Sequence, residues 1–220
     1  MDNIMVFAPH PDDDIIGCGG SIARHISQGD QVTIVYMTSG EAGSLRYEAS
    51  LLANLRENEA RQAAQLLGAG ELIFLRQPDG YLEYTPAGLI RIVDLVRQHR
   101  PTRVYLPHSQ EAVPDHHITY RLASEGIRRA AGPWFQQGKP EPWRVDTIMG
   151  YEVWTPLAVI GCSQDISPYM DLKLTALRMH RTQIESIAYD EAVEGLNRYR
   201  GVMSGLGQYC ECFQLIRASV

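Results

Sequence analysis

The chain has little of what marks several classes of protein. Its four cysteines show none of the spacings of a zinc knuckle, so we expect reduced thiols that pack in the core. No apolar run is long enough to span a bilayer, and the first residues lack the cationic start and the long apolar stretch of a secretory signal, which favours a cytoplasmic protein. The net charge of -6 gives no electrostatic footprint for nucleic acid. We therefore expect neither nucleic acid nor a membrane as a partner.

What the chain does have is enough apolar material for one folded unit. Its 220 residues are 45% hydrophobic and 21% charged, which is typical of a single compact domain, here residues 1–220. Short apolar runs alternate with segments that carry apolar residues at helical spacing. The predicted strands cover 3–8, 31–37, 71–75, 102–106 and 145–150, and the predicted helices cover 15–29, 50–67, 85–100 and a segment ending near 129. This alternation predicts a Rossmann-like α/β fold, with a mostly parallel sheet and helices on both faces.

The end of the chain departs from this alternation. We expect two helices, over about 171–187 and 189–204, followed by a last strand over 208–216. The proline-rich loop 132–143 carries Trp134 and Trp143, which are expected to anchor it, although a subunit contact there, and hence a homo-oligomer, stays open. His25 and His99 lie in ordinary helical stretches and are expected to be solvated.

The most informative segment follows the first predicted strand. It reads Ala8-Pro9-His10-Pro11-Asp12-Asp13-Asp14, and a glycine-rich helix start comes directly after it. A helix N-terminus needs about one carboxylate as a cap, so three acids and an imidazole exceed what capping requires. A divalent metal would account for the surplus.

A second polar cluster follows the fourth predicted strand. In doubly wound sheets the first and fourth strands commonly lie side by side, and ligands bind outside their carboxyl ends. His10 and Asp13 are one helical turn apart, so either His116 or His117 could complete a set of two imidazoles and one carboxylate. Such a set leaves coordination positions open for water, as catalytic metals require. It would suit Zn²⁺, and it is also the facial triad of Fe²⁺ enzymes, so Fe²⁺ remains an alternative.

Taken together, these motifs resemble the LmbE-like, or PIG-L, family of zinc-dependent de-N-acetylases. The segments that carry the resemblance cover most of the chain in the family's order. They are 8–14 with Gly17, Gly19 and Gly20, the loop 38–43, Arg56-Glu57-Asn58-Glu59, Pro78-Asp79-Gly80, Pro114-Asp115-His116, and the late residues Lys173, Ala176, His180 and Gln183. The resemblance implies a metal-dependent hydrolase that removes the acetyl group from an N-acetylated amino sugar or a related small N-acyl conjugate.

Carried over by position, the resemblance also implies roles for single residues. His10, Asp13 and His116 would bind zinc, and Asp12 would be the general base that takes a proton from water. His117 is expected to be a surface residue or to lie behind the ligands.

Further roles are expected around this set. Asp115 would hold the tautomer of the adjacent His116, and Arg56 and Asp79 would bind sugar hydroxyls. Arg56 also has an ordinary alternative, as half of a helix-surface pair with Glu59.

Two positions depart from the family pattern. Asp14 stands where the family often has glutamate, and Val113 stands where many members have a histidine that is thought to steady the tetrahedral intermediate. We expect another histidine to supply that donor. His108 or His180 are the candidates, with His180 favoured because its helix resembles a family motif, and His108 would otherwise contact the substrate.

Other functions are weighed against this hypothesis. A nucleotide-binding α/β protein would explain the glycines that open the first helix, but three adjacent acids would repel phosphates and the spacing misses the Gly-x-Gly-x-x-Gly pattern. A metal-dependent phosphoesterase would use similar ligands, yet we find too few further acids near the fourth strand to hold a second ion. A non-catalytic interaction protein remains if no metal binds.

Overall fold

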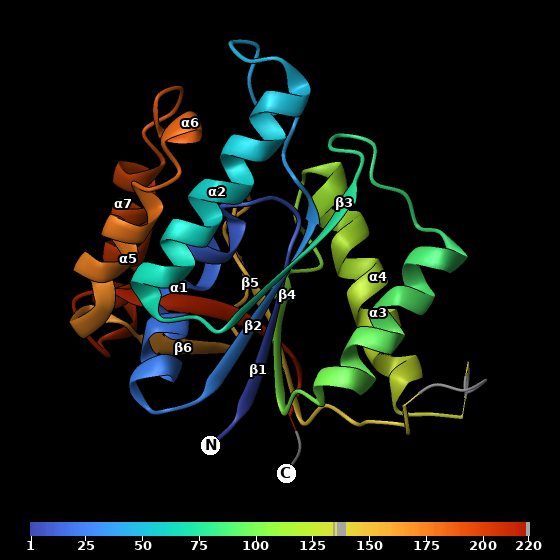
Figure 1. The fold of residues 1–220 in the computed structure, drawn as a ribbon. Coiled ribbons are helices and arrows are strands. Elements are labelled where there is room, and N and C mark those ends of the chain that lie inside the picture. Colours follow the sequence, from blue (N-terminus) through green and yellow to red (C-terminus); the bar gives the residue numbers. More distant parts are fainter. Residues whose placement is uncertain (134, 136–139, 219–220) are drawn as a thin grey trace.

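The fold is built on one central sheet. The computed structural model describes residues 1–133, 135 and 140–218 of the chain, and the expectation for Trp134 lies outside these residues. Within them a seven-stranded sheet runs in the order β3-β2-β1-β4-β5-β7-β6 (Figure 1). The strands are β1 (Asn3–Ala8), β2 (Gln31–Thr38), β3 (Glu71–Gln77), β4 (Arg103–Pro107), β5 (Thr147–Tyr151), β6 (Cys162–Asp165) and β7 (Cys210–Arg217).

The first five strands are parallel to one another, and among the described strands only β7 runs in the opposite direction. β1 pairs in parallel with both β2 and β4, while β7 pairs antiparallel with β5 and with β6. The predicted neighbourhood of the first and fourth strands is therefore confirmed. So is the mostly parallel α/β sheet.

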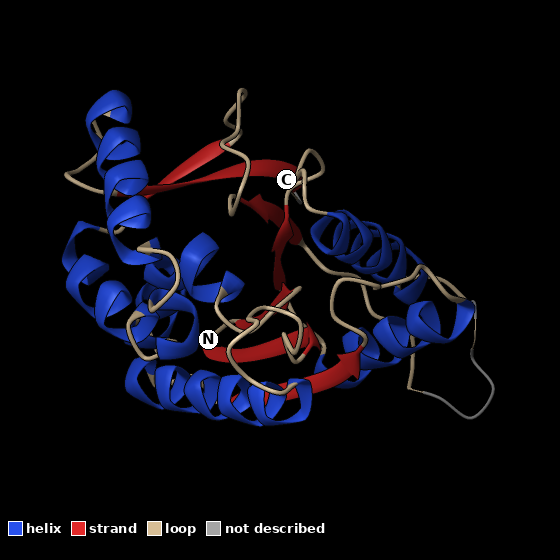
Figure 2. Ribbon diagram, turned by 90° about the horizontal axis from the view of Figure 1, so that it is seen from above, coloured by secondary structure: helices blue, strands red, loops and turns tan. Residues whose placement is uncertain are grey.

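Helices cover both faces of the sheet, as Figures 1 and 2 show. They are α1 (Asp13–Ser27), α2 (Ala49–Leu67), α3 (Pro86–His99), α4 (Pro114–Ala130), η1 (Ser167–Tyr169), α5 (Met170–Leu177), α6 (Arg181–Ile184) and α7 (Tyr189–Ser204). β1 is a continuous apolar run because both of its faces are buried. On one face Val6 packs in the core under α1, α2 and α5, and on the other face Met5 and Phe7 pack in the core under α3 and α4. No helix in the described part of the chain is long and apolar enough to cross a membrane.

The predicted start of α3 is confirmed in detail. Thr85 is its N-cap, and its hydroxyl accepts a hydrogen bond from the Gly88 amide at 3.0 Å, with Pro86 in the first turn. The predicted helix over 171–187 is wrong, because α5 ends at Leu177 and α6 begins only at Arg181. Glu59 on α2 explains the break. Its carboxylate accepts a hydrogen bond from the Thr182 amide at 2.9 Å and so caps the first turn of a new helix, although Glu59 itself lies on another helix.

One strand was not expected, and two expectations about single residues can be compared with the structure. β6 was not predicted, because its sequence Cys-Ser-Gln-Asp has no apolar alternation. His25 is buried and not solvated, and its ring nitrogens face Asp30 at 2.8 Å and the Tyr105 hydroxyl at 2.9 Å. The Trp143 indole donates to the Pro101 carbonyl at 2.8 Å, so it anchors the end of its loop.

Helix α1 is kinked shortly after the segment 8–14. Cys18 has φ −146° and ψ 23°, which releases backbone groups on either side of it. Glu211 on β7 accepts hydrogen bonds from the Gly20 and Ser21 amides, both at 2.8 Å, and the Lys173 ammonium donates to the Ile16 carbonyl at 2.9 Å. Lys173 and Glu211 also pair with each other at 2.7 Å, and both are buried. A buried ion pair thus replaces the helical hydrogen bonds that the kink removes.

Candidate active site

The candidate site lies where the carboxyl ends of the parallel strands meet. His10 follows β1 and Asp13 begins α1, while His116 lies in the first turn of α4, which follows β4. Figure 2 looks down on the loops that gather over this part of the sheet. Because β1 and β4 are adjacent, residues more than 100 positions apart in the sequence come together here.

Three predicted metal ligands lie around one point. His10 Nδ1 is 3.0 Å from Asp13 Oδ2, and His116 Nε2 is 3.3 Å from the same oxygen. The ring centroids of the two histidines are 5.3 Å apart, and one ligand atom from each of the three residues lies within 4.8 Å of the others. His117, the other candidate, is exposed.

The chemistry of these residues fits a divalent metal. His116 is fully buried, and neither of its ring nitrogens makes a hydrogen bond to the described residues. Burial lowers its pKa below the ordinary value, which keeps the imidazole neutral with a lone pair to offer. Buried polar atoms seldom lack partners, so an orphaned imidazole beside a carboxylate points to a missing cation. Two imidazoles and a carboxylate are a donor set that zinc accepts.

Asp115 and Asp79 flank the other side of His10. Its Nε2 lies 2.9 Å from Asp79 Oδ1 and 3.3 Å from Asp115 Oδ2. The expectation that Asp115 orients His116 is therefore corrected, since its imidazole partner is His10. Ligating histidines commonly donate their second N–H to a carboxylate, and this arrangement leaves Nδ1 of His10 facing Asp13.

Backbone amides hold these two carboxylates in place. Asp115 accepts from Gly80 at 2.8 Å and from Leu82 at 3.2 Å, and Asp79 accepts from Ala42 at 2.8 Å. More carboxylates surround His10 than the sequence indicated, and with His10 they form a second group that could hold a metal ion. Because the backbone already uses three of their four oxygens, we interpret them as supports of His10 and not as a second metal site.

Asp12 adopts an unusual backbone conformation. Its φ is 130°, in a region that favours glycine. Burial raises the pKa of its carboxyl to about 7, although the Arg56 guanidinium, 3.1 Å away, opposes this shift. Asp12 and Asp13, although adjacent in sequence, are therefore separated in role. Both line the cavity, but Asp12 contacts Arg56 whereas Asp13 contacts the two histidines.

Arg56 is not half of a helix-surface pair, and its contact with sugar hydroxyls stays a prediction. It is buried, and it donates to the Pro11 carbonyl at 2.7 Å and the Gly40 carbonyl at 3.1 Å besides contacting Asp12. It does not pair with Glu59. Its guanidinium therefore joins the segment 8–14 to the loop after β2, and the side chain also lines the cavity.

The two histidines expected to replace the one absent at position 113 have different surroundings. His108 is buried with Nε2 2.7 Å from the Thr155 carbonyl, and Nδ1 accepts from the Gln110 amide at 3.1 Å, which leaves it no nitrogen for a substrate. His180 is also buried, but neither of its ring nitrogens has a partner among the described residues. Burial, with Arg56 nearby, lowers its pKa to about 3, so it is neutral. Val113 lines the cavity with an apolar side chain.

Sequence reasoning missed Glu111 altogether. This buried carboxylate accepts hydrogen bonds from three successive amides, those of Val153 at 2.9 Å, Trp154 at 3.1 Å and Thr155 at 3.2 Å. Its other oxygen is 3.6 Å from His116 Nδ1. Glu111 thus joins the loop after β5 to a metal-ligand candidate. An acid between His108 and His116 was the only signal, and loops commonly contain acids.

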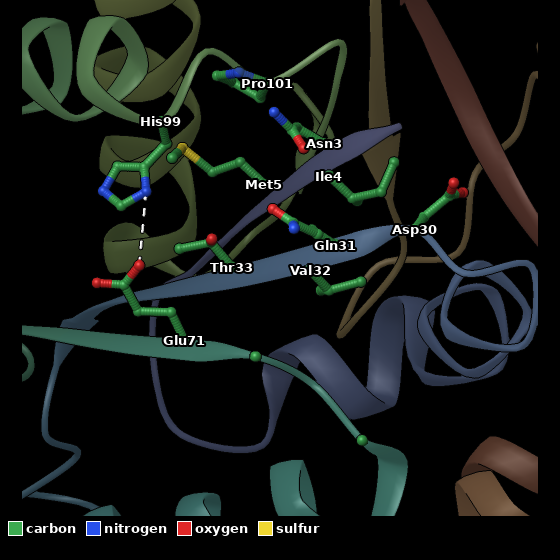
Figure 3. Close-up of a pocket in the computed structure, with 12 residues that line it drawn as sticks. Asn3, Ile4, Met5, Asp30, Gln31, Val32, Thr33, Glu71, His99 and Pro101 are labelled. Atoms are coloured by element: carbon green, nitrogen blue, oxygen red, sulfur yellow. Dashed lines mark ion pairs between the residues drawn. The ribbon is translucent and has the colours of Figure 1, made fainter. Parts of the chain in front are cut away.

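A cavity of about 310 Å³ opens onto this cluster, which is enough for a small ligand. Its lining includes His10, Asp12, Asp13, Arg56, Asp79, Val113, Asp115, Trp154, Gln183 and Tyr189. Another hollow, of about 350 Å³, lies at the amino ends of β1, β2 and β3, where His99 and Glu71 form an ion pair at 3.6 Å (Figure 3). Both metal-donor groups found among the described residues lie at the opposite end of the sheet.

The glycines that open α1 serve packing. A methyl group on Gly17 would overlap the ring of Tyr151, and one on Gly20 would overlap Ile166. Asp14, the third acid, points inward and accepts from the Tyr36 hydroxyl at 3.0 Å. These glycines therefore bring the helix close to its neighbours and do not form a phosphate cradle, which removes the observation that favoured a nucleotide-binding protein.

Comparisons with known proteins agree on one family. The model of the PIG-L family, described as GlcNAc-PI de-N-acetylase, matches residues 5–127, more than half of the chain. The diacetylchitobiose deacetylase of Thermococcus kodakarensis is 29% identical over 214 residues, covering 92% of this chain and 79% of that protein.

Solved structures show the same fold. The N,N'-diacetylchitobiose deacetylase of Pyrococcus horikoshii superposes with a TM-score of 0.87 at 28% identity, over 98% of this chain and 84% of that chain. The 4-carboxy-2-hydroxymuconate hydratase of Pseudomonas putida superposes with a TM-score of 0.90 at 23% identity, over 100% and 98%. The second likeness concerns the fold alone, because one fold can carry different reactions.

Proposed function

This chain belongs to the PIG-L family of GlcNAc-PI de-N-acetylases, and we propose that it is a zinc-dependent hydrolase that removes the acetyl group from a small N-acetylated amino-sugar conjugate. The observation that carries the proposal is the convergence of His10, Asp13 and His116 around one point, beside a cavity that His10 and Asp13 line. The deacetylases among its relatives act, by their names, on acetylated amino sugars, which supports this substrate class. The same ligand set also suits Fe²⁺, so metal identity is part of the test.

The metal would supply the electrophilic part of the chemistry. When bound by these three residues, zinc would lower the pKa of a water molecule and polarise the acyl carbonyl. Asp79 and Asp115 would hold the His10 ring through Nε2, which leaves Nδ1 for the metal. Glu111 would do the same for His116 through its Nδ1, which lies 3.6 Å from the carboxylate.

Asp12 would move the proton. Its carboxylate lines the cavity next to Asp13, and its contact with Arg56 at 3.1 Å fixes its orientation. As general base it would take a proton from the attacking water and return it to the departing amine nitrogen, an effect worth about 10²–10⁴-fold in rate. Arg56 would act here as a positioning residue, because its two terminal nitrogens already contact the carbonyls of two loops and Asp12.

The oxyanion needs a further donor. His180 is our candidate, because it is a buried, neutral imidazole near enough to Arg56 and Asp13 for their charges to act on its pKa, and neither of its nitrogens has a partner among the described residues. It lies behind the residues that line the cavity. His108 is a poor candidate, since both its nitrogens contact the backbone. Loss of one such donor typically lowers turnover about 10²–10³-fold.

The test combines metal analysis with a substrate panel. Purified protein is stripped, reloaded with Zn²⁺ or Fe²⁺, and assayed for free amine with several N-acetylated amino sugars, and with p-nitrophenyl phosphate as the phosphoesterase control. We expect about one bound metal per chain, amine release, and no phosphate release. A protein that holds no metal, or one that cleaves only the phosphate ester, would contradict the proposal.

Four variants separate the roles. His10→Ala and Asp13→Ala should lose the metal, while His117→Ala, the matched control at an exposed position, should keep it. Asp12→Asn should keep the metal yet lose at least about a hundredfold in turnover. Near-normal turnover in Asp12→Asn would refute its role as the base.

A further inference from the structure

A second hollow lies beside the active-site cavity. It has a volume of about 300 Å³ and shares three wall residues with the cavity, Ile16, Trp154 and Tyr189. The rings of Trp154 and Tyr189 meet edge to face, with centroids 5.5 Å apart, and form the partition between the two spaces. A molecule bound at the metal cluster would therefore have this hollow as its immediate neighbour.

The walls of the hollow are apolar. Besides the shared residues, its lining consists of Val153, Pro156, Ile187, Ala192, Val193, Leu196 and Asn197. The amide of Asn197 is already used at both ends, because its oxygen accepts from Lys173 at 2.8 Å and its nitrogen donates to the Cys210 carbonyl at 3.0 Å. Apart from the Tyr189 hydroxyl and the Trp154 indole N–H, the lining side chains have nothing to offer a polar ligand.

Two large apolar side chains that line this hollow are exposed to solvent. Trp154 is 49% exposed and Ile187 is 48% exposed, although both border a concave surface. Apolar surface gathered in a hollow beside a polar site is typical of a ligand pocket. The Trp154 backbone is held by Glu111, which also accepts from both neighbouring amides, so this wall is preformed.

We propose that this hollow, which we call the apolar pocket, binds an apolar group carried by the substrate, a phenyl ring or a short alkyl chain. The inference rests on the proposed function, since it takes the neighbouring cavity as the place where the amide is cleaved. Two parts of such a substrate could carry the group, the aglycone of the amino sugar or the acyl chain on its nitrogen. Either one must pass the Trp154–Tyr189 partition.

The experiment compares three substrates with the zinc-loaded enzyme. They are N-acetylglucosamine, its phenyl β-glycoside, and N-hexanoylglucosamine, so the second tests the aglycone and the third the acyl chain. We expect one of the two substituted substrates to show at least about tenfold higher kcat/KM than N-acetylglucosamine, mainly through a lower KM, because each buried methylene is worth about fourfold in binding.

Three variants locate the effect. Ile187→Asp places a charge in the apolar pocket, Ala192→Trp fills it, and Val202→Asp is the matched control on the same helix as Ala192, outside the pocket. Ile187 and Val202 are about half exposed or more, so neither change threatens folding. The first two variants should reduce the advantage of the substituted substrate to less than about threefold, while the control keeps it and activity on N-acetylglucosamine is unchanged in all three.

Binding without turnover separates this inference from the proposed function. Calorimetry with phenyl β-D-glucopyranoside and with hexan-1-ol, neither of which has an amide, should show binding of at least one that Ile187→Asp weakens about tenfold or more. Such binding in a protein that deacylates nothing supports the apolar pocket and refutes the proposed function. Deacetylation with equal kcat/KM for all three substrates, or an advantage that survives both Ile187→Asp and Ala192→Trp, overturns the pocket and leaves the function standing.

Discussion

The buried pair of Lys173 and Glu211 allows a quantitative test of how the kink in α1 is held. The Lys173 ammonium donates to the Ile16 carbonyl at 2.9 Å, the Asn197 amide oxygen at 2.8 Å and Glu211 at 2.7 Å, which uses all three of its protons. Lys173→Met keeps most of the side-chain volume but leaves Glu211 as an uncompensated buried charge. Breaking a buried pair from one side typically costs about 3–5 kcal/mol. For a chain of this size each kcal/mol lowers Tm by about 2–4 °C, so we expect a fall of roughly 10 °C.

The assay is urea unfolding of four proteins. They are the native chain, Lys173→Met, Glu211→Gln and the double variant, with Arg91→Met on the exposed surface as control. The double variant should be more stable than Lys173→Met, because Gln at position 211 removes the stranded charge and still offers one oxygen, which can accept from one of the two amides of Gly20 and Ser21. A loss below about 1 kcal/mol in Lys173→Met, or strictly additive effects of the two changes, would refute this account.

Three further predictions concern other parts of the chain. The Arg76 guanidinium lowers the pKa of Glu57 from 4.5 to about 2, so the Glu57 carboxylate stabilises the fold above about pH 4.5 and this contribution is lost as the pH falls toward 2. In urea unfolding, Glu57→Gln should be less stable than the native chain at pH 7 and equal to it near pH 2. A difference in stability that does not change with pH would contradict this prediction. Gly17→Ala should lower the free energy of unfolding by about 1–3 kcal/mol, because the added methyl group would overlap the Tyr151 ring. That ring is fully buried, and its hydroxyl donates to the Phe7 carbonyl at 2.8 Å. An unchanged Tm would show that the ring can move. His180→Phe should keep the metal and lose about 10²–10³-fold in turnover, whereas full activity on a verified substrate would leave the oxyanion to other donors.

The parallel part of the fold was predictable because its signals are local. Each buried strand is a short apolar run, and Thr85 with Pro86 marks a helix start through its own side chains. The break after Leu177 was not predictable, since its cause is the carboxylate of Glu59, more than 100 residues earlier in the chain. The kink at Cys18 depends in the same way on Lys173 and Glu211, and no property of the α1 sequence announces it.

In the site, too, the residues marked by local sequence motifs were predictable, and the contacts between distant segments were not. His10, Asp13 and His116 could be selected because a motif and a strand order bring them together, and the metal they are expected to bind remains a prediction. The direction in which a side chain points was harder to foresee. Asp115 is adjacent to His116 in sequence but turns toward His10, because the amides of Gly80 and Leu82 hold it there. Glu111 contacts a loop about 40 residues later in the sequence, and only the folded chain reveals that.

The backbone of Asp12 has a consequence for anyone who engineers this enzyme. A φ of 130° costs an aspartate about 1–3 kcal/mol that a glycine would not incur. Redesign guided by backbone conformation alone would therefore rank glycine at position 12 as an improvement, although loss of the carboxylate leaves the buried Arg56 guanidinium without a partner that lies 3.1 Å away. Libraries built on this chain should keep codon 12 constant and be selected on turnover.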